Sequence, residues 1–306
     1  MLTQAQLQRF AHESGIRNLD IVEKEVVLTY FLQLLSQSGF LADLAFKGGT
    51  CIRKTWLGPN GRFSTDVDFT AMQSTKSADD YVLQLADITA KPFHGIQFEI
   101  DMSDKGWYEA DDGVSWGVSP NYCHALGNGV LKLQVSNREL PTLPMDLRRQ
   151  LEISYFKLLP FKPAELSCLR IEEILAEKIR ATYQRSKPRD IWDLDQFADR
   201  PFHEPLIRKL VIIKLWQARE PFLTERWSAK LNDARAWDWD DLRQLVRGGP
   251  LDPKQMLAHC AGRYGFLGQM TQDEAVLAAD PYQRRQDLHQ KIAAECNALA
   301  EEYRLT

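Results

Sequence analysis

The sequence predicts an α/β protein of the α+β kind, in which an α/β N-terminal domain precedes a helical C-terminal domain. Three features of the 306-residue chain support this prediction. Short apolar stretches with strand-like alternation occur between residues 44 and 136. Four prolines, from Pro141 to Pro163, then interrupt any helix. Apolar residues recur at helical spacing from residue 171 onward, so we expect domains at 1–162 and 163–306.

Composition limits the class of protein. Hydrophobic residues at 44% and charged residues at 26% are typical of a soluble globular protein. A net charge of −4 argues against a protein that coats nucleic acid over its whole surface, although it allows a local basic site. The five cysteines are dispersed without a C-x-x-C pair, which favours reduced thiols. With no signal-peptide pattern and no apolar stretch of membrane-spanning length, we expect a cytoplasmic protein without membrane contact.

Two helices are expected before the first strand. Thr3 is suited to cap a short helix that Gly15 ends. A second helix is predicted over residues 20–37, where apolar side chains recur at helical spacing. Asp20 with Glu23 three residues later has the form of a capping box, so Asp20 is interpreted as a cap and not as a catalytic acid.

One stretch, AFKGGTCIRKTWLGPNGRFSTDVDFT at residues 45–70, combines a glycine turn with a pair of aspartates. In a strand, alternate residues share a face, so Asp66 and Asp68 point the same way. Two such carboxylates repel each other unless a cation lies between them or one is protonated. Oxygen ligands suit Mg²⁺, which proteins hold with one or two carboxylates plus phosphates. Gly48 and Gly49 would let the backbone approach a phosphate closely.

Each half of this stretch has an ordinary explanation, since Gly-Gly pairs form turns and Asp-x-Asp pairs are often solvated. The combination KGGTCIRK…RFSTDVDF is more specific. It resembles the nucleotidyltransferase signature of the polymerase-β superfamily, and more narrowly that of the AbiEii-like toxins, which include the MenT type. The resemblance implies a polymerase-β-like nucleotidyltransferase domain with a mixed sheet.

A second block of the sequence resembles the same family. Helices are predicted at 172–184 and from Asp190 onward, separated by Pro188. Glu177-Lys178 on the first helix and the Arg-Asp-x-x-Asp-Leu segment at 189–194 match the family pattern. The resemblance implies that Lys178 and Asp190 belong to the active site. The chemistry agrees, because a lysine neutralises triphosphate oxygens and an aspartate orients it or accepts a proton.

Asp193 of the same segment is interpreted as structural, through pairing with Arg189 or through capping. The helices expected after residue 200 lie outside the resemblance.

A third acidic residue is usual in this superfamily, on a strand that follows the aspartate pair. Strands are predicted at 94–102 and 129–136, with loops or at most a hairpin between them. In the second strand Gln134 occupies the position where the acid is expected. Either Glu99 or Asp101 supplies a third ligand, or the metal is held by two carboxylates and the nucleotide, which is the version we favour.

The resemblance implies attack of an acceptor hydroxyl on the α-phosphorus of an NTP, with pyrophosphate leaving. Asp66 and Asp68 would hold Mg²⁺ or Mn²⁺, in a cleft to which the helical domain contributes Lys178 and Asp190. The acceptor implied is RNA, the tRNA 3′ end, so that translation is blocked, and a cognate antitoxin is the implied partner. The candidate phosphate-binding residues are Lys47, Gly48, Gly49, Thr50, Arg53 and Ser64. Arg53 is the lesser candidate among them, because an ordinary surface arginine is equally expected at this position.

Two other functions stay open at this point. The first is nucleotidyl transfer to a protein or small-molecule acceptor, which a neutral-to-acidic surface fits about as well. The second is an NTP-binding module, for example for GTP, that never transfers the nucleotide, since a third carboxylate is missing.

Overall fold

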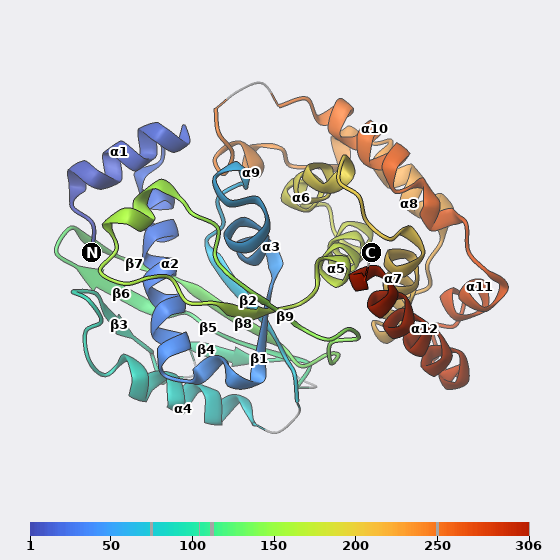
Figure 1. Ribbon diagram of the computed structural model, residues 1–306, viewed down its shortest axis with the longest axis horizontal. Coiled ribbons are helices and arrows are strands. Elements are labelled where there is room, and N and C mark those ends of the chain that lie inside the picture. The colour runs from blue at the N-terminus through green and yellow to red at the C-terminus, as the bar shows by residue number, and fades with distance from the viewer. Residues whose placement is uncertain (74–75, 104, 111–112, 249–250, 306) are drawn as a thin grey trace. The chain divides into compact units, whose positions relative to one another are not determined.

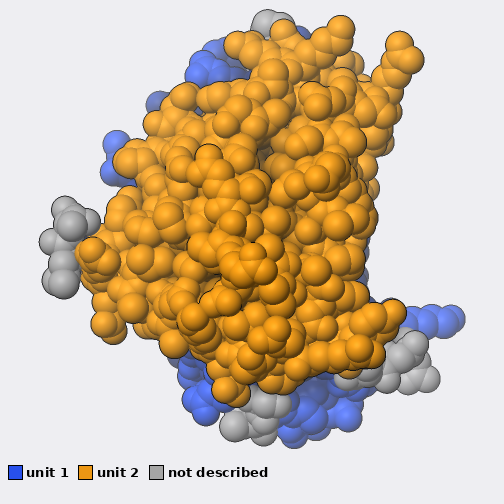
Figure 2. All heavy atoms as spheres, turned by 90° about the vertical axis from the view of Figure 1, so that its right-hand side faces the viewer, with its two compact units in different colours: residues 1–140, 145–168, 244–248 blue, residues 141–144, 169–243, 249–306 orange. Residues whose placement is uncertain are grey.

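The computed structural model describes residues 1–73, 76–103, 105–110, 113–248 and 251–305 (Figure 1). These residues form two compact units, coloured separately in Figure 2. Unit 1 comprises 1–140, 145–168 and 244–248, and unit 2 comprises 141–144, 169–243 and 249–306. The chain therefore changes unit after Cys168 and not at residue 163, because Leu166–Cys168 forms a strand of the unit 1 sheet. Among the described residues, no helix is long and apolar enough to cross a membrane.

The two N-terminal helices form as expected, with one different cap. Helix α1 (Gln4–Ser14) has Thr3 in a capping box and ends at Gly15, whose φ is 71°. Helix α2 (Leu19–Gln37) is capped by Asn18, whose side chain accepts a hydrogen bond from the Asp20 amide. The predicted Asp20 cap is therefore wrong, because Asn18 holds the extended backbone that a capping residue needs. Asp20 lies in the first turn, where a carboxylate is favourable.

A seven-stranded mixed sheet forms the centre of unit 1, in the order β4-β5-β8-β2-β1-β10-β9. Strand β2 pairs antiparallel with β1 and parallel with β8. This arrangement confirms the α/β fold class with a mixed sheet. The strands are β1 (Leu44–Lys47), β2 (Asp66–Ala71), β4 (Trp107–Glu109), β5 (Ser115–Val118), β8 (Lys132–Ser136), β9 (Asp146–Arg148) and β10 (Leu166–Cys168).

A second, three-stranded sheet contains β3 (Gln97–Glu99), β6 (Asn121–His124) and β7 (Gly127–Val130). The predicted strand at 94–102 is thus shorter than expected. The predicted strand at 129–136 divides at Leu131, where the chain passes from the small sheet to the large one. Strands β4, β5 and β6 occupy the region expected to form loops or a hairpin, of which residues 104, 111 and 112 lie outside the described residues.

The apolar face of the large sheet forms the core of unit 1. Phe69, Val135 and Trp116 lie side by side on β2, β8 and β5 and are buried. Tyr81 of helix α4 (Ala78–Thr89) stacks on Trp116 with ring centroids 5.2 Å apart. The opposite face of the same strands carries polar side chains. The short elements of the unit are η1 (Phe40–Asp43), α3 (Gly48–Ile52), the π-helix η2 (Arg53–Leu57), η3 (Gly58–Asn60) and η4 (Ser154–Leu158).

Unit 2 is helical in its described residues, as expected for the C-terminal part of the chain. Helix α5 packs against α6 and α7, and α12 packs against α7 (Figure 1). Helix α7 is buried on almost every side, so it forms the centre of this unit. Its helices are α5 (Ile171–Gln184), α6 (Pro188–Ala198), α7 (Glu204–Gln217), α8 (Thr224–Leu231), η5 (Ala234–Ala236), α9 (Asp240–Arg243), α10 (Pro253–Arg263), η6 (Gly265–Gly268), α11 (Gln272–Ala278) and α12 (Gln286–Leu305).

Candidate active site

The two aspartates of the sequence motif lie on one face of β2. Asp66 and Asp68 are partly exposed, whereas Val67 and Phe69 between and after them are buried in the core. The strand therefore presents both carboxylates away from the core, as the period of two predicts. On the neighbouring strand β1, Lys47 lies directly opposite Asp68 in the antiparallel register.

The glycine turn after β1 lies against the second of these carboxylates. Gly48 has a φ of +76°, a conformation that L side chains rarely adopt. A β-carbon at this position would overlap the carboxylate of Asp68. A β-carbon on Gly49 would overlap the guanidinium of Arg62 and lie 3.3 Å from the hydroxyl of Ser64. The turn, the aspartate, the arginine and the serine therefore converge at one place.

Thr50 follows the turn, but its hydroxyl is hydrogen-bonded to the backbone. The Oγ1 atom donates a hydrogen bond to the main-chain oxygen of Asp66, and the side chain is fully buried. Thr50 thus fixes helix α3 to the first residue of β2. This contact favours a positioning role over direct contact with a phosphate.

Arg53 lies in a buried network of polar contacts. Its Nη1 atom donates to the carbonyl oxygens of Gly58, at 3.2 Å, and Gly61. Its Nε atom lies 3.2 Å from Oε2 of Glu25, and the guanidinium lies over the ring of Phe63. With 2% of its surface exposed, Arg53 is not the surface arginine that the sequence left as an alternative, because its guanidinium is held inside the core.

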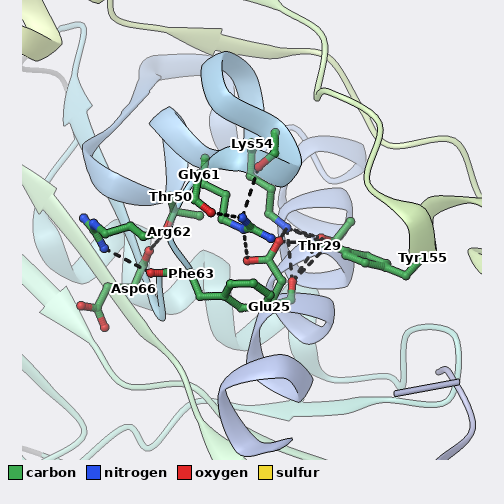
Figure 3. A network of polar contacts seen from close by, with 11 residues as sticks. Glu25, Thr29, Thr50, Lys54, Gly61, Arg62, Phe63, Asp66 and Tyr155 are labelled. Atoms are coloured by element: carbon green, nitrogen blue, oxygen red, sulfur yellow. Dashed lines mark hydrogen bonds and ion pairs between the residues drawn. The ribbon is translucent and has the colours of Figure 1, made fainter. Parts of the chain in front are cut away.

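Arg62 is a candidate that the sequence prediction did not include. It is buried, and its Nη1 atom donates to the carbonyl oxygen of Phe63 at 3.2 Å (Figure 3). Its guanidinium faces Gly49 and Ser64, so it places positive charge at the glycine turn. A signal was present in the sequence, because Arg62 stands two residues before Ser64 in the segment RFSTDVDF.

The third position of the acidic set is occupied by an amide. In the parallel register of β2 and β8, Gln134 lies opposite Asp68 and Lys132 lies opposite Asp66. The strand position expected from the sequence is therefore the one observed. The side chain of Gln134 is exposed, and its Nε2 atom donates to the hydroxyl of Tyr108 at 2.7 Å.

The two alternative ligands lie elsewhere. Glu99 belongs to β3 of the small sheet. Asp101 is exposed and accepts a hydrogen bond from the amide of Ser103 at 2.9 Å. In the described part of the chain, no group of three or more His, Cys, Asp and Glu side chains is arranged to hold a metal. Asp66 and Asp68 alone suit a cation such as Mg²⁺, which keeps most of its coordination for phosphate oxygens and water.

Within unit 2, Lys178 and Asp190 are in direct contact. The ammonium of Lys178 on α5 lies 2.8 Å from Oδ1 of Asp190 and 2.7 Å from Oδ2 of Asp193, both on α6. Arg185 contacts the other oxygen of Asp190 at 3.0 Å. Asp193, for which the sequence favours a structural role, thus contacts Lys178 as closely as Asp190 does, while Arg189 lies 3.9 Å from Asp241.

This cluster determines the ionisation of Asp190. Burial by itself would raise the pKa of the carboxyl, but the charges of Lys178 and Arg185 outweigh burial and hold that pKa well below its usual value. A carboxylate with such a low pKa accepts protons poorly. Of the two roles suggested by the sequence, orientation of Lys178 is therefore favoured over general base.

The charged side chains of the unit 1 site suit both a cation and an anion. Asp66 and Asp68 supply negative charge for a divalent cation. Lys47 and Arg62 supply positive charge on the side of the glycine turn, and a guanidinium is well matched to phosphate oxygens. Such a pairing is suited to a nucleoside triphosphate with its metal ion.

Comparison with known proteins gives consistent results. The family model described as nucleotidyl transferase AbiEii toxin, type IV TA system, matches residues 30–302. The match includes the helices after residue 200, for which the motifs gave no resemblance. No curated protein matches the chain.

Among solved structures, the chain is similar to MenT4, a nucleotidyltransferase toxin from Mycobacterium tuberculosis H37Rv. The two are 28% identical with a TM-score of 0.80, over 97% of this chain and 100% of that chain. A putative nucleotidyltransferase from H. pylori is 17% identical with a TM-score of 0.45, over 89% of this chain and 96% of that chain. JHP933 from Helicobacter pylori is 15% identical with a TM-score of 0.46, over 93% of this chain and 98% of that chain.

Proposed function

The chain belongs to the AbiEii nucleotidyl transferase toxin family, and from this premise we propose that it transfers a nucleotide from an NTP to the 3′ end of a tRNA. Pyrophosphate is released in this reaction. A tRNA extended at its 3′ end no longer accepts an amino acid, so translation would stop. Because the family is described as part of a type IV TA system, we propose a cognate antitoxin as the protein partner, acting in the cytoplasm.

The observation that best supports this function is the convergence of Asp68, Arg62 and Ser64 on the Gly48-Gly49 turn. Asp66 and Asp68 would hold Mg²⁺, which would neutralise phosphate charge and make the acceptor hydroxyl more acidic. The glycines allow the backbone to approach the triphosphate, and Arg62, Lys47 and Ser64 supply donors to its oxygens.

The bond changes follow from the chemistry of phosphoryl transfer. The oxygen of the acceptor hydroxyl forms a bond to the α-phosphorus, and the bond from that phosphorus to the bridging oxygen of pyrophosphate breaks. Negative charge accumulates on the leaving pyrophosphate while the hydroxyl proton passes to solvent. Arg62 and Lys47 stabilise that charge because they are positioned before the reaction begins.

Lys178 and Asp190 are included in the proposed machinery. We assign Lys178 to a triphosphate oxygen and Asp190 to its orientation, which the 2.8 Å contact between them supports. Asp193 contributes to the same orientation through its 2.7 Å contact with the ammonium.

Label transfer tests this function directly. Purified protein is incubated with Mg²⁺, total tRNA and each α-labelled NTP in turn, beside Asp66→Asn and Asp68→Asn variants. Label on tRNA with the natural protein and at least a hundredfold less with either variant is expected, since the aspartates would no longer hold the cation. Glu99→Gln and Asp101→Asn are matched controls that should retain activity, because both carboxylates lie away from β2.

The amide at position 134 favours a second candidate, an NTP-binding module without transfer. Gln134 occupies the place of a third carboxylate, and an amide neither neutralises a cation nor accepts a proton readily. Tight NTP binding without label on any acceptor would support this candidate and contradict transfer. Label on protein instead of tRNA would identify a protein acceptor.

A further inference from the structure

Beyond the aspartate pair, the same face of the large sheet continues across three more strands. Lys132 and Gln134 lie beside Asp66 and Asp68 in the register of β2 and β8. Gly117 of β5 lies opposite Gln134, and Tyr108 of β4 lies opposite Gly117. Paired residues of neighbouring strands share a face. Lys132, Gln134, Gly117 and Tyr108, called here the acceptor strip, therefore form one surface next to the candidate active site.

The ring of Tyr108 lies against Gly117 of this strip. A β-carbon on Gly117 would be 2.5 Å from Cε1 of Tyr108 and 2.9 Å from both Cζ and Oη, so the ring rests directly on the glycine. The hydroxyl accepts a hydrogen bond of 2.7 Å from Nε2 of Gln134, which fixes the ring on the side of Asp68. The tyrosine side chain is nevertheless 47% exposed. The ring is thus held by Gly117 and Gln134 while the residue stays about half open to solvent.

The direction of the reaction indicates what this strip receives. In phosphoryl transfer the attacking and leaving oxygens lie roughly in line through the phosphorus. The glycine turn, Arg62 and Ser64, proposed to hold the leaving pyrophosphate, follow β1 on one side of β2. Strands β8, β5 and β4 lie on the other side of β2. The attacking hydroxyl must come from that other side, which is the side of the acceptor strip.

We propose that Tyr108 stacks with the 3′-terminal base of an RNA acceptor, and that the exposed Lys132 pairs with an adjacent backbone phosphate. This inference rests on the proposed function. Aromatic side chains are common platforms for unpaired bases, and a positively charged lysine beside the ring complements the negative charge of the RNA backbone. Gln134 is a positioning residue that holds the ring through the hydrogen bond from its amide nitrogen to the tyrosine hydroxyl.

Stacking on an aromatic ring tolerates different bases, since every base has a π-face. The acceptor strip therefore predicts weak preference for the identity of the terminal base. It also predicts a requirement for single-stranded RNA at the 3′ end, because a paired base cannot expose its face to the ring.

The test uses the full-length protein and a short RNA that ends in 2-aminopurine, without any NTP. Binding is followed by fluorescence anisotropy, and stacking by quenching of the terminal base. Tyr108→Leu should weaken binding about ten- to hundredfold and abolish the quenching, in line with about 1–3 kcal/mol per stacked base. Tyr108→Phe keeps the ring but loses the hydrogen bond from Gln134, so its binding and quenching should fall between those of the natural protein and those of Tyr108→Leu. Tyr282→Ala is the matched control, because Tyr282 is a tyrosine that is 76% exposed and lies in unit 2.

Gly117→Ala provides a second variant in case Tyr108→Leu folds poorly. The added methyl group would displace the ring while keeping it in the protein, so quenching should be lost although all aromatic residues remain. Unchanged binding and quenching in both variants would overturn the proposal. It would also be overturned if the natural protein did not bind the RNA. A third contradicting result would be a Tyr108→Leu variant whose only change, in the label-transfer assay, is a higher KM for NTP.

These outcomes separate this proposal from the proposed function. RNA binding is measured without nucleotide, whereas label transfer requires it. RNA binding and quenching that depend on Tyr108, without transfer of label, would support the acceptor strip and contradict the transferase. Label transfer that does not depend on Tyr108 would support the transferase and contradict the acceptor strip.

Discussion

Glycine is required at residue 48 for two separate reasons. Its φ is +76°, and the space that a β-carbon would occupy is filled by the carboxylate of Asp68. Gly39 has almost the same φ, +74°, but no atom lies within 4 Å of the position of its missing β-carbon. An alanine at either position would strain the backbone, but only an alanine at residue 48 would also displace the carboxylate of Asp68. Comparison of the two variants therefore distinguishes these effects.

We predict that Gly48→Ala lowers kcat of nucleotidyl transfer about a hundredfold, because misplacement by about 1 Å at a reacting centre has effects of that size. Gly39→Ala should destabilise the protein by about 1–2 kcal/mol through its left-handed conformation and leave kcat unchanged. Label transfer and urea unfolding of both variants check this. Equal kcat in the two variants would show that Gly48 has no role beyond its backbone conformation.

The ionisation of Asp190 determines which role its carboxylate can have. With its pKa held well below the usual value, the carboxylate stays ionised throughout the working pH range. Asp190→Asn should lower kcat/KM about tenfold or more by misorienting Lys178, without changing the shape of the pH–rate profile. Asp199→Asn, on an exposed side chain, is the control. Loss of the acidic limb of the profile in Asp190→Asn alone would instead identify Asp190 as the general base.

At the scale of elements, a buried ionic network joins α2 to the segment that follows the glycine turn (Figure 3). Oε1 of Glu25 lies 2.6 Å from Nζ of Lys54, and Oε2 lies 3.2 Å from Nε of Arg53. Lys54 also donates to Thr29 and to the hydroxyl of Tyr155 on η4. Burial lowers the pKa of Lys54 to about 8, although Glu25 opposes this shift.

Removal of the single carboxylate should leave two buried cations without compensation. We expect Glu25→Gln to destabilise the protein by about 3–5 kcal/mol at pH 7. Part of this loss should be recovered as the pH rises, because unfolded Lys54 holds its proton to a higher pH than folded Lys54 does. The free energy of unfolding at pH 6 and pH 9 tests both points.

Glu13→Gln is the matched control, because Glu13 pairs with the exposed Arg9 at the surface. Its effect on stability should be small, because exposed ion pairs contribute little. A Glu25→Gln variant as stable as this control would show that the network contributes little to the fold of unit 1.

For the whole molecule, buried carboxylates determine the response to acid. Burial would raise the pKa values of Glu25, Asp190 and Glu274, but neighbouring cations and hydrogen bonds lower all three below their ordinary values. A lowered folded-state pKa gives stability that is present above the unfolded value and is lost as the pH falls towards the folded one.

We therefore predict that the free energy of unfolding is nearly constant from pH 7 to pH 5 and falls steeply below about pH 4.5, where carboxylates of the unfolded chain begin to bind protons. Urea unfolding between pH 3 and pH 7 measures this. The loss should persist in 0.5 M salt, because buried pairs are screened much less than surface pairs. A flat profile down to pH 3 would contradict the prediction.

Much of the fold could be predicted from the sequence, because its signals are local. Strand alternation placed Asp66 and Asp68 on one face, and helical periodicity located the helices of unit 2. A hairpin was one of the expectations for this region, but strands β4 and β5 could not be located, since Gly, Trp and Asp there give no clear period and β5 forms by pairing with β4 and β8. The Asp20 cap was wrong because adjacent polar residues compete for the same capping position.

The candidate site divides in the same way. The sequence by itself determined the family, the aspartate pair, the glycine turn and the position of Gln134, since each is a short motif or a strand period. The tertiary structure alone decided that Arg62 and not Arg53 faces the turn, and that Tyr108 rests on Gly117 beside Gln134. Arg53 and Arg62 look alike in the sequence. What distinguishes them is long-range packing, because Glu25 comes from a helix far earlier in the chain and fixes one guanidinium inside the core.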